Sequence, residues 1–263
     1  MSSSSAPGII LATGTYGVSL KGHAGIYMSR DAGLTWHKVL KEIYFVNLGD
    51  HGGIITAVKY FKSTGDTNEI LFSTDEGETW KAYKFADNPI RVYGLMTEPG
   101  ENTTVFTVFG SEPTKHSWII VNLDLRNVFK YNCTKDDYKK WSPSSTSGLK
   151  MACVMGKKET YERRVPHSNC YNGKDYDSPI TMETCLCDIE DFECDFGFLR
   201  HSSMPECIRN KSSIIDPYDI PDTCKPGSFY NRTKGYRKID ADACVDGYER
   251  NYLPDTLPCP YRF

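Results

Sequence analysis

The cysteines of this chain are confined to its second half, and their distribution limits the possible folds more than any other feature. All ten lie between Cys133 and Cys259, whereas the first 132 residues contain none. Secreted domains with a small apolar core often stabilise themselves with disulfides, whereas cytosolic proteins rarely concentrate thiols in this way. The number is even, so every cysteine can be paired. We therefore expect a disulfide framework in an oxidising compartment.

Metal binding and thiol catalysis are the alternatives for these cysteines. Cys185 and Cys187 form a C-x-C pair, and Cys194 and Cys207 follow it. Structural zinc sites usually show paired C-x2-4-C knuckles, or a C-x2-C followed by H-x3-5-H, and neither pattern occurs here. A redox C-x-x-C motif is also absent. We expect no metal site and no cofactor.

Four N-glycosylation sequons favour the same compartment, and they begin at Asn102, Asn132, Asn210 and Asn231. The first seven residues have neither the basic nor the apolar region of a signal peptide. The sequence has no apolar run of about eighteen residues, which is the length needed to span a bilayer. These observations favour a piece of a larger extracellular protein, or an incomplete gene product.

The charge of the chain argues against nucleic-acid binding. Its net charge is −3 and its pI is near 6.1, so it has no large basic field. Four basic residues do cluster, and we expect them to form a solvated surface patch, with contact to an acidic partner as the alternative: Lys157, Lys158, Arg163 and Arg164.

The first 125 residues have the pattern of an all-β array of antiparallel hairpins. Short runs rich in β-branched and aromatic residues alternate with Gly, Asp, Asn and Pro at roughly ten-residue intervals. The expected strands are 8–14, 25–29, 44–48, 54–60, 69–73, 80–85, 90–96, 104–109 and 117–123. A short helix is expected over 124–130, followed by a tail with few long strands and many turns.

An internal repeat identifies the kind of β array. The pattern S-x-D-x-G-x-T-W occurs twice, 44 residues apart, in the motif known as the Asp-box. Its structural residues are Ser29, Asp31, Gly33 and Trp36 in the first copy and Ser73, Asp75, Gly77 and Trp80 in the second. A repeat of this length in a β context indicates four-stranded propeller blades. About two blades and part of a third fit here, which would leave strand edges exposed unless further blades cover them.

The glycine-rich stretch from Gly49 to Ile55 contains Asp50 and His51 and could belong to a catalytic site. The stretch has no serine or cysteine in the sequence pattern of a catalytic nucleophile, and no phosphate-binding helix is expected after it. We interpret it as a tight turn before a buried strand. His51 could still sense pH, because histidine titrates in the endosomal range.

Taken together, these motifs resemble those of the sortilin-type (Vps10p-domain) sorting receptors, whose lumenal part is a ten-bladed propeller followed by a ten-cysteine module. Besides the Asp-boxes, the resemblance is carried by the stretches 49–55, 94–100, 133–138, 187–197 and 235–239. The stretches 141–143, 166–170 and 258–260 are most similar to the SorLA branch. The resemblance implies blades over 1–125 and the module over 126–263, with subdomains of about 126–186 and 187–263.

The disulfide pairing comes from this resemblance alone. Eight cysteines already allow 105 connectivities, and ten allow about nine times more, so the sequence itself cannot select one. Carried onto the ten cysteines in order, the family pattern implies Cys133–Cys170, Cys153–Cys185, Cys187–Cys244, Cys194–Cys207 and Cys224–Cys259.

The resemblance also implies a function in binding. Receptors of this type carry peptide and protein ligands, such as propeptides, neuropeptides and amyloid-type peptides, between Golgi, endosome and cell surface, and a homodimer is possible. Their main ligand contacts lie in upstream blades, so no ligand-binding residue can be assigned, and membrane attachment would require segments outside this sequence. One alternative is a soluble, truncated ligand-binding isoform. Another is a sialidase-like Asp-box glycoside hydrolase, which needs an arginine cluster or a carboxylate pair. The arginines Arg30, Arg91 and Arg126 are isolated in the sequence.

Overall fold

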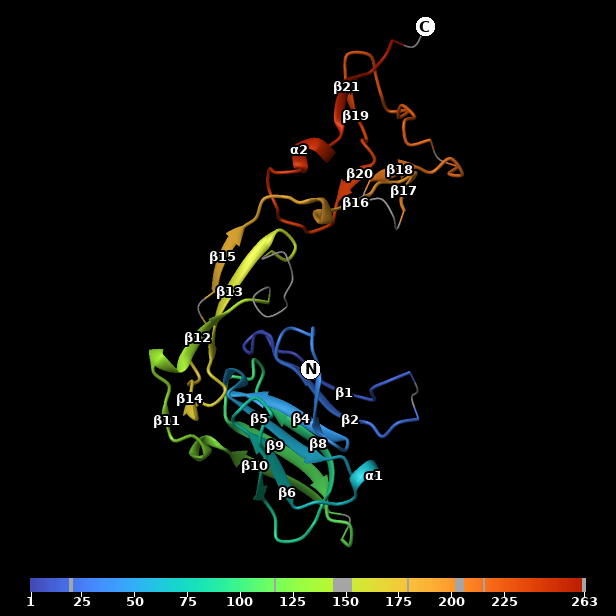
Figure 1. The fold of residues 1–263 in the computed structure, drawn as a ribbon. Helices are drawn as coiled ribbons and strands as arrows, with labels where there is room; N and C mark the ends of the chain where they lie inside the picture. The colour runs from blue at the N-terminus through green and yellow to red at the C-terminus, as the bar shows by residue number, and fades with distance from the viewer. Residues whose placement is uncertain are drawn as a thin grey trace. The chain divides into compact units, whose positions relative to one another are not determined.

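The structure is a computed structural model of the 263-residue chain, and it describes residues 1–18, 21–115, 117–143, 153–178, 180–201, 206–214 and 216–261. The described residues form many short strands and a few single-turn helices (Figure 1). They divide into two compact units. The first contains Met1–Leu149 and Thr160–Thr181, and the second contains Lys150–Glu159 and Met182–Phe263.

Three antiparallel sheets follow one another along the first unit, and the middle one has four strands (Figure 1). Their strands are β1 (Ile10–Gly14), β2 (Gly25–Ser29) and β3 (His37–Leu40); β4 (Tyr44–Gly49), β5 (Ile54–Lys59), β6 (Glu69–Ser73) and β7 (Lys81–Lys84); and β8 (Arg91–Thr97), β9 (Val105–Ser111) and β10 (Trp118–Asp124). The nine expected strands are present, with ends within two residues of the predicted ones. The strand β3 was not predicted, because its short sequence is half exposed and has little apolar alternation.

Two apolar cores hold these sheets together. The first joins β1 and β2 to β4 and β5 through Leu11, Ile26, Met28, Leu48 and Ile55. The second joins the middle sheet to β8 and β9, and its members include Ile54, Val58, Ile70, Val92, Phe106 and Val108. Alternate residues of β9 are buried, which is the period of two expected of a strand with one face against a core. Each fully buried side chain of this size contributes roughly 1.5–3 kcal/mol.

Short helices connect the strands of the first unit. They are η1 (Asp50–Gly52), α1 (Phe61–Thr64), η2 (Arg126–Val128) and η3 (Lys135–Asp137). The turn expected at the glycine-rich stretch is η1, and it leads into β5, whose first five residues are buried. The short helix expected over 124–130 is the single turn η2.

The cysteine-rich part, in which few long strands were expected, contains one long strand among its described residues. β13 (Lys157–Arg164) has eight residues, whereas the strands β1 to β10 have at most seven. β13 lies in a sheet with β12 (Tyr138–Trp141) and β15 (Ile180–Thr184), and β11 (Tyr131–Asn132) pairs with β14 (Cys170–Tyr171). The remaining elements are η5 (Ile189–Asp191), β16 (Phe192–Cys194) with β20 (Tyr236–Lys238), β17 (Phe198–Arg200) with β18 (Cys207–Arg209), β19 (Phe229–Arg232) with β21 (Asp255–Pro258), and α2 (Glu249–Tyr252).

All ten cysteines are joined in disulfides. The pairs are Cys133–Cys170, Cys153–Cys185, Cys187–Cys244, Cys194–Cys207 and Cys224–Cys259, the same pairs that the family resemblance implies. The first bridge lies in the first unit and the other four lie in the second. The buried apolar cluster of the second unit is small and consists of Cys187, Phe192 and Cys244. Because so little apolar surface is buried there, we attribute much of that unit's stability to its bridges, each worth about 2–4 kcal/mol.

Candidate functional site

The two Asp-boxes have the same hydrogen bonds. In the first, Ser29 Oγ donates to Asp31 Oδ1 at 2.8 Å and accepts from the backbone N–H of Gly33 at 2.7 Å. In the second, Ser73 Oγ makes the equivalent bonds to Asp75 and Gly77 at 2.7 and 2.8 Å. Burial alone would raise the pKa of both aspartates, but hydrogen bonds from the following threonine and the preceding serine outweigh it and lower the pKa. Each box is therefore a self-contained turn.

The boxes differ at the residue after the aspartate, which has a positive φ in both. This residue is Ala32 in the first box (φ 62°) and Glu76 in the second (φ 56°). The side chain at this position takes no part in the turn's own hydrogen bonds, which are made by the serine, aspartate and glycine of each box. In the second box the position is therefore available for a contact with another segment.

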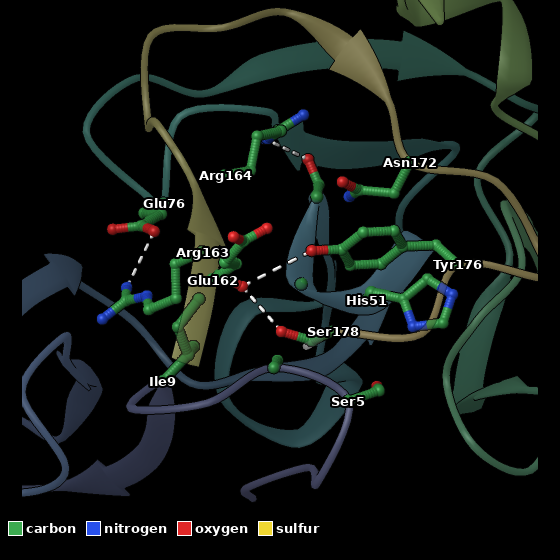
Figure 2. Close-up of a pocket in the computed structure, with 13 residues that line it drawn as sticks. Ser5, Ile9, His51, Glu76, Glu162, Arg163, Arg164, Asn172, Tyr176 and Ser178 are labelled. Atoms are coloured by element: carbon green, nitrogen blue, oxygen red, sulfur yellow. Dashed lines mark hydrogen bonds and ion pairs between the residues drawn. The ribbon is translucent and has the colours of Figure 1, made fainter. Parts of the chain in front are cut away.

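Glu76 uses this position to bind a residue of the cysteine-rich part. Its carboxylate lies 2.8 Å from Arg163 Nη2, and both side chains are 7% exposed (Figure 2). The Arg163 guanidinium also donates to the backbone carbonyl of Arg30 at 2.7 Å and lies over the ring of Trp141. The expectation of a solvated basic patch is therefore wrong for Arg163. Its position at the buried end of β13, not its charge, decides its environment.

Arg164 is also buried, and backbone carbonyls surround its guanidinium. It donates to Cys170 O at 2.6 Å, to Gly53 O at 2.8 Å and to Thr74 O at 2.6 Å. Cys170 begins β14, Gly53 lies in the turn before β5, and Thr74 belongs to the second Asp-box. The planar guanidinium of arginine suits a site with several carbonyl acceptors, because its N–H donors point in fixed directions. The other two members of the predicted patch, Lys157 and Lys158, are only partly buried.

A third contact joins the glycine-rich turn to the segment after Cys170. Asp50 Oδ2 accepts from the backbone N–H of Asn172 at 3.0 Å, and Oδ1 accepts from that of Gly173 at 3.0 Å. Asn172 Nδ2 also donates to Asp50 O at 2.7 Å. Burial raises the pKa of Asp50, although the two backbone hydrogen bonds oppose the shift. A Cβ at Gly53 would lie 2.4 Å from Asp50 Oδ2, so glycine is required there.

We call these three sets of contacts, made by Arg163, Arg164 and Asn172, the clamp. They attach residues 160–178 to the sheet formed by β4 to β7 and its turns within the first unit. Figure 2 shows Arg163, Arg164 and Asn172 among the residues that line a small polar cavity. The cavity has a volume of about 30 Å³, which is large enough for a water molecule. Sequence reasoning missed the role of Glu76, Asn172 and both arginines. The available signals were the acidic residue at the variable box position and the adjacent arginines in a strand-like stretch.

His51 lines the same cavity and contacts Gly173 and Tyr176. Its Nε2 is 3.0 Å from the carbonyl oxygen of Gly173, and its ring packs edge-on against Tyr176. Ser178, which also lines the cavity, donates to Glu162 O at 2.7 Å (Figure 2). The side chains of His51 and Ser178 are therefore used in packing and in contacts with backbone carbonyls. The turn interpretation made from the sequence agrees with this arrangement.

The remaining predicted residues are dispersed. The arginines considered for an Asp-box enzyme have separate partners: Arg30 donates to Glu76 O, Arg91 pairs with Asp66 at 3.4 Å, and Arg126 lies over the ring of Tyr171. In the part of the chain that the structure describes, the cluster closest to a metal site in composition is Cys187, Asp191 and Cys244. Its two sulfurs form a disulfide and are therefore not thiolate ligands.

The four sequon asparagines lie at partly or fully exposed positions. Asn132 Oδ1 accepts from Arg126, Asn210 Oδ1 from the backbone of Ser212, and Asn231 Oδ1 from Thr256. These contacts use the amide oxygen, whereas a glycan would be attached to the amide nitrogen. Asn102 lies in the loop between β8 and β9.

Comparison with known proteins identifies the family. A family model described as "Sortilin, neurotensin receptor 3, C-terminal" matches residues 97–259, and a second, Sortilin-Vps10, matches residues 1–95. The chain belongs to the sortilin family. This sortilin-family chain is 43% identical over 264 residues to "Sortilin-related receptor" of Mus musculus and to that of Homo sapiens, with 99% of the chain covered. It is 36% identical over 260 residues to "VPS10 domain-containing receptor SorCS2" of Homo sapiens, with 97% covered.

The sortilin-family chain spans only a small part of these relatives. It covers 12% of the sortilin-related receptors and 22% of SorCS2. These relatives are named as receptors, and none of the three has the name of an enzyme. Within the described ranges, no helix of this chain has the length and apolar character needed to cross a membrane.

Proposed function

We propose that this chain is a ligand-binding and bracing part of the lumenal region of a sorting receptor, and that it is not catalytic. In this proposal the cargo consists of peptides or proteins, and the compartments are Golgi, endosome and cell surface. Residues 1–125 would be the last blades of a ten-bladed propeller. Residues 126–263 would be the ten-cysteine module, with subdomains of about 126–186 and 187–263.

The clamp is the observation that carries the proposal. It joins two blade turns, which contain Asp50 and Glu76, to residues 160–178 through buried and charge-assisted hydrogen bonds. Breaking a buried ion pair of this kind costs about 3–5 kcal/mol. Such an attachment supports a bracing role, because it would hold one side of the blades in a fixed shape while a ligand binds.

A binding measurement on the secreted chain tests this proposal. The probe is neurotensin, chosen because the family description names a neurotensin receptor. We expect saturable binding by calorimetry and no hydrolysis of a fluorogenic sialoside or glucoside. Glycoside turnover that disappears when one carboxylate is removed would contradict the non-catalytic assignment. Absence of binding by neurotensin and by a panel of propeptides would contradict the cargo-binding assignment.

A further inference from the structure

The loop that follows β18 in the second unit presents one tyrosine to solvent. Tyr218 is 42% exposed, and the residues after it, 219–223, are exposed as well. Among the described residues, the Tyr218 hydroxyl group has no hydrogen-bond partner, and only the backbone N–H of this residue is bonded within the turn. The hydroxyl group is therefore accessible to a modifying enzyme.

Acidic residues surround Tyr218 in the sequence. Asp216, Asp219 and Asp222 lie within four positions of it, and the stretch 212–224 contains no lysine, arginine or histidine. Asp219 and Asp222 belong to the exposed part of the loop. Carboxylates that are grouped on an exposed loop attract a macromolecule with a basic cleft. The loop therefore suits an enzyme that binds its protein substrate through positive charge.

Two other tyrosines also lie directly beside a pair of aspartates, but their hydroxyl groups are used within the first unit. Tyr138 donates to Asn172 Oδ1 at 2.7 Å. Tyr176 donates to Glu162 O at 3.4 Å. Neither side chain is exposed to the extent of Tyr218. Sequence and accessibility together therefore single out Tyr218.

The aromatic ring of Tyr218 has neighbours that position it without using its hydroxyl group. It packs edge-on against Phe198, with 5.9 Å between the ring centroids. The guanidinium groups of Arg209 and Arg232 lie 5.5 and 5.9 Å from its centroid. Arg209 also pairs with Asp216 at 2.8 Å. A new anionic group on the hydroxyl oxygen would therefore have two flexible guanidinium side chains close enough to pair with it.

We propose that Tyr218 is a site of O-sulfation. The donor is a nucleotide phosphosulfate, and the enzyme is a tyrosine sulfotransferase of the Golgi lumen. Tyr218 Oη attacks the sulfur atom, the Oη–S bond forms as the S–O bond to the nucleotide phosphate breaks, and the phenol proton passes to a base of the enzyme. Because the donor carries several negative charges, its enzyme needs a basic cleft, which the acidic loop complements. The inference rests on the proposed lumenal function, because the donor and the enzyme are found in that compartment.

The test is peptide mass spectrometry on the full chain, secreted from cells that contain this enzyme. We expect one added sulfate group on Tyr218 that alkaline phosphatase does not remove. Tyr218→Phe should abolish the modification. Tyr230→Phe, in β19, is the control and should leave it unchanged, because Tyr230 has no acidic residue within four positions. Replacing both Asp219 and Asp222 with asparagine should lower the modified fraction about tenfold, because the attraction to a basic cleft is weaker.

Three outcomes would overturn the inference. If the secreted chain carries complex N-glycans, which show passage through the Golgi, but Tyr218 is unmodified, the sulfation site is wrong while the proposed compartment stands. If phosphatase removes the added group, the modification is a phosphate. If the double asparagine variant is secreted and sulfated as the wild type is, the acidic loop does not direct the enzyme. Purified sulfotransferase with its nucleotide donor, applied to the folded chain, tests Tyr218 even if the proposed compartment is wrong.

Discussion

Glu76 of the second Asp-box and Arg163 of β13 form a buried ion pair, with 2.8 Å between Oε1 and Nη2. The two residues are 87 positions apart in the sequence. The second Asp-box therefore does more than close a hairpin, because its variable position also attaches β13 to the turn after β6. The first box has Ala32 at that position.

Replacing Glu76 with alanine, the residue that the first box has at this place, tests the pair. The Glu76→Ala variant would leave the buried Arg163 guanidinium without its carboxylate. We expect the free energy of unfolding to fall by about 3–5 kcal/mol in urea denaturation. Glu78→Ala is the control, since Glu78 is 43% exposed and makes only a long contact with His167, and its cost should stay below about 1 kcal/mol. Equal effects of the two substitutions would contradict the role of the clamp.

Gly156 is required in the second unit by both backbone conformation and space. Its φ is +69°, and a Cβ there would lie 1.9 Å from the backbone nitrogen of Cys244. We expect Gly156→Ala to cost about 4 kcal/mol or more and to abolish secretion of folded protein. Gly227→Ala isolates the conformational part, because Gly227 has φ +87° with open space around it. That variant should lose only about 1–2 kcal/mol, and similar secreted yields for both variants would show that the close approach is wrong.

Asp137 gives the first unit a specific dependence on pH. Hydrogen bonds from the backbone of Thr134 and from Tyr131 hold its pKa at about 2, below the ordinary value of 3.8. Because the pKa is lower in the folded state, the stabilisation is present above about pH 4 and is lost as the pH falls through 2. Melting temperatures between pH 7 and 2 should show a smaller acid loss for Asp137→Asn than for the wild type. Its exposed neighbour provides the control, Asp136→Asn, which should follow the wild type; parallel curves for all three proteins would contradict the assignment.

The sheets could be predicted from sequence because their signals are local. Alternating apolar residues in β9 and turn residues around each strand define the nine predicted strands, and the repeated Asp-box indicated their grouping. β3 was missed since it packs little apolar surface. The turn at Asp50 was predicted from its glycines, and its backbone is indeed left-handed at Asp50 and His51.

The clamp could not be predicted, because it depends on long-range packing. In the sequence, Arg163 and Arg164 belong to a basic cluster typical of an exposed surface. Their place against the turns that contain Asp50 and Glu76 depends on the pairing of β12 with β13, which are joined only after folding. Asn172 gave no signal, since its contribution comes from a backbone N–H and a side-chain amide that both meet Asp50. The pairing of the cysteines likewise came from family resemblance and not from spacing.

Disulfide mapping on protein expressed through a secretory pathway tests the cysteine framework. Non-reducing peptide mass spectrometry should find the bridge from Cys133 to Cys170 and the four bridges of the second unit, with no free thiol. Removing a bridge by Cys194→Ser with Cys207→Ser should cost about 2–4 kcal/mol. Different pairs, or free thiols that bind zinc, would contradict the framework.

The most direct test of the clamp is hydrogen–deuterium exchange at the amides of Asn172 and Gly173. Both donate to the carboxylate of Asp50, so the account predicts strong protection in the wild type. Asp50→Asn removes one acceptor oxygen and should speed exchange at one or both amides by about tenfold or more, whereas the exposed control Asp87→Asn should have no effect. If the two amides exchange in the wild type as fast as an unstructured loop, the cysteine-rich segment is not attached to the blades in this way.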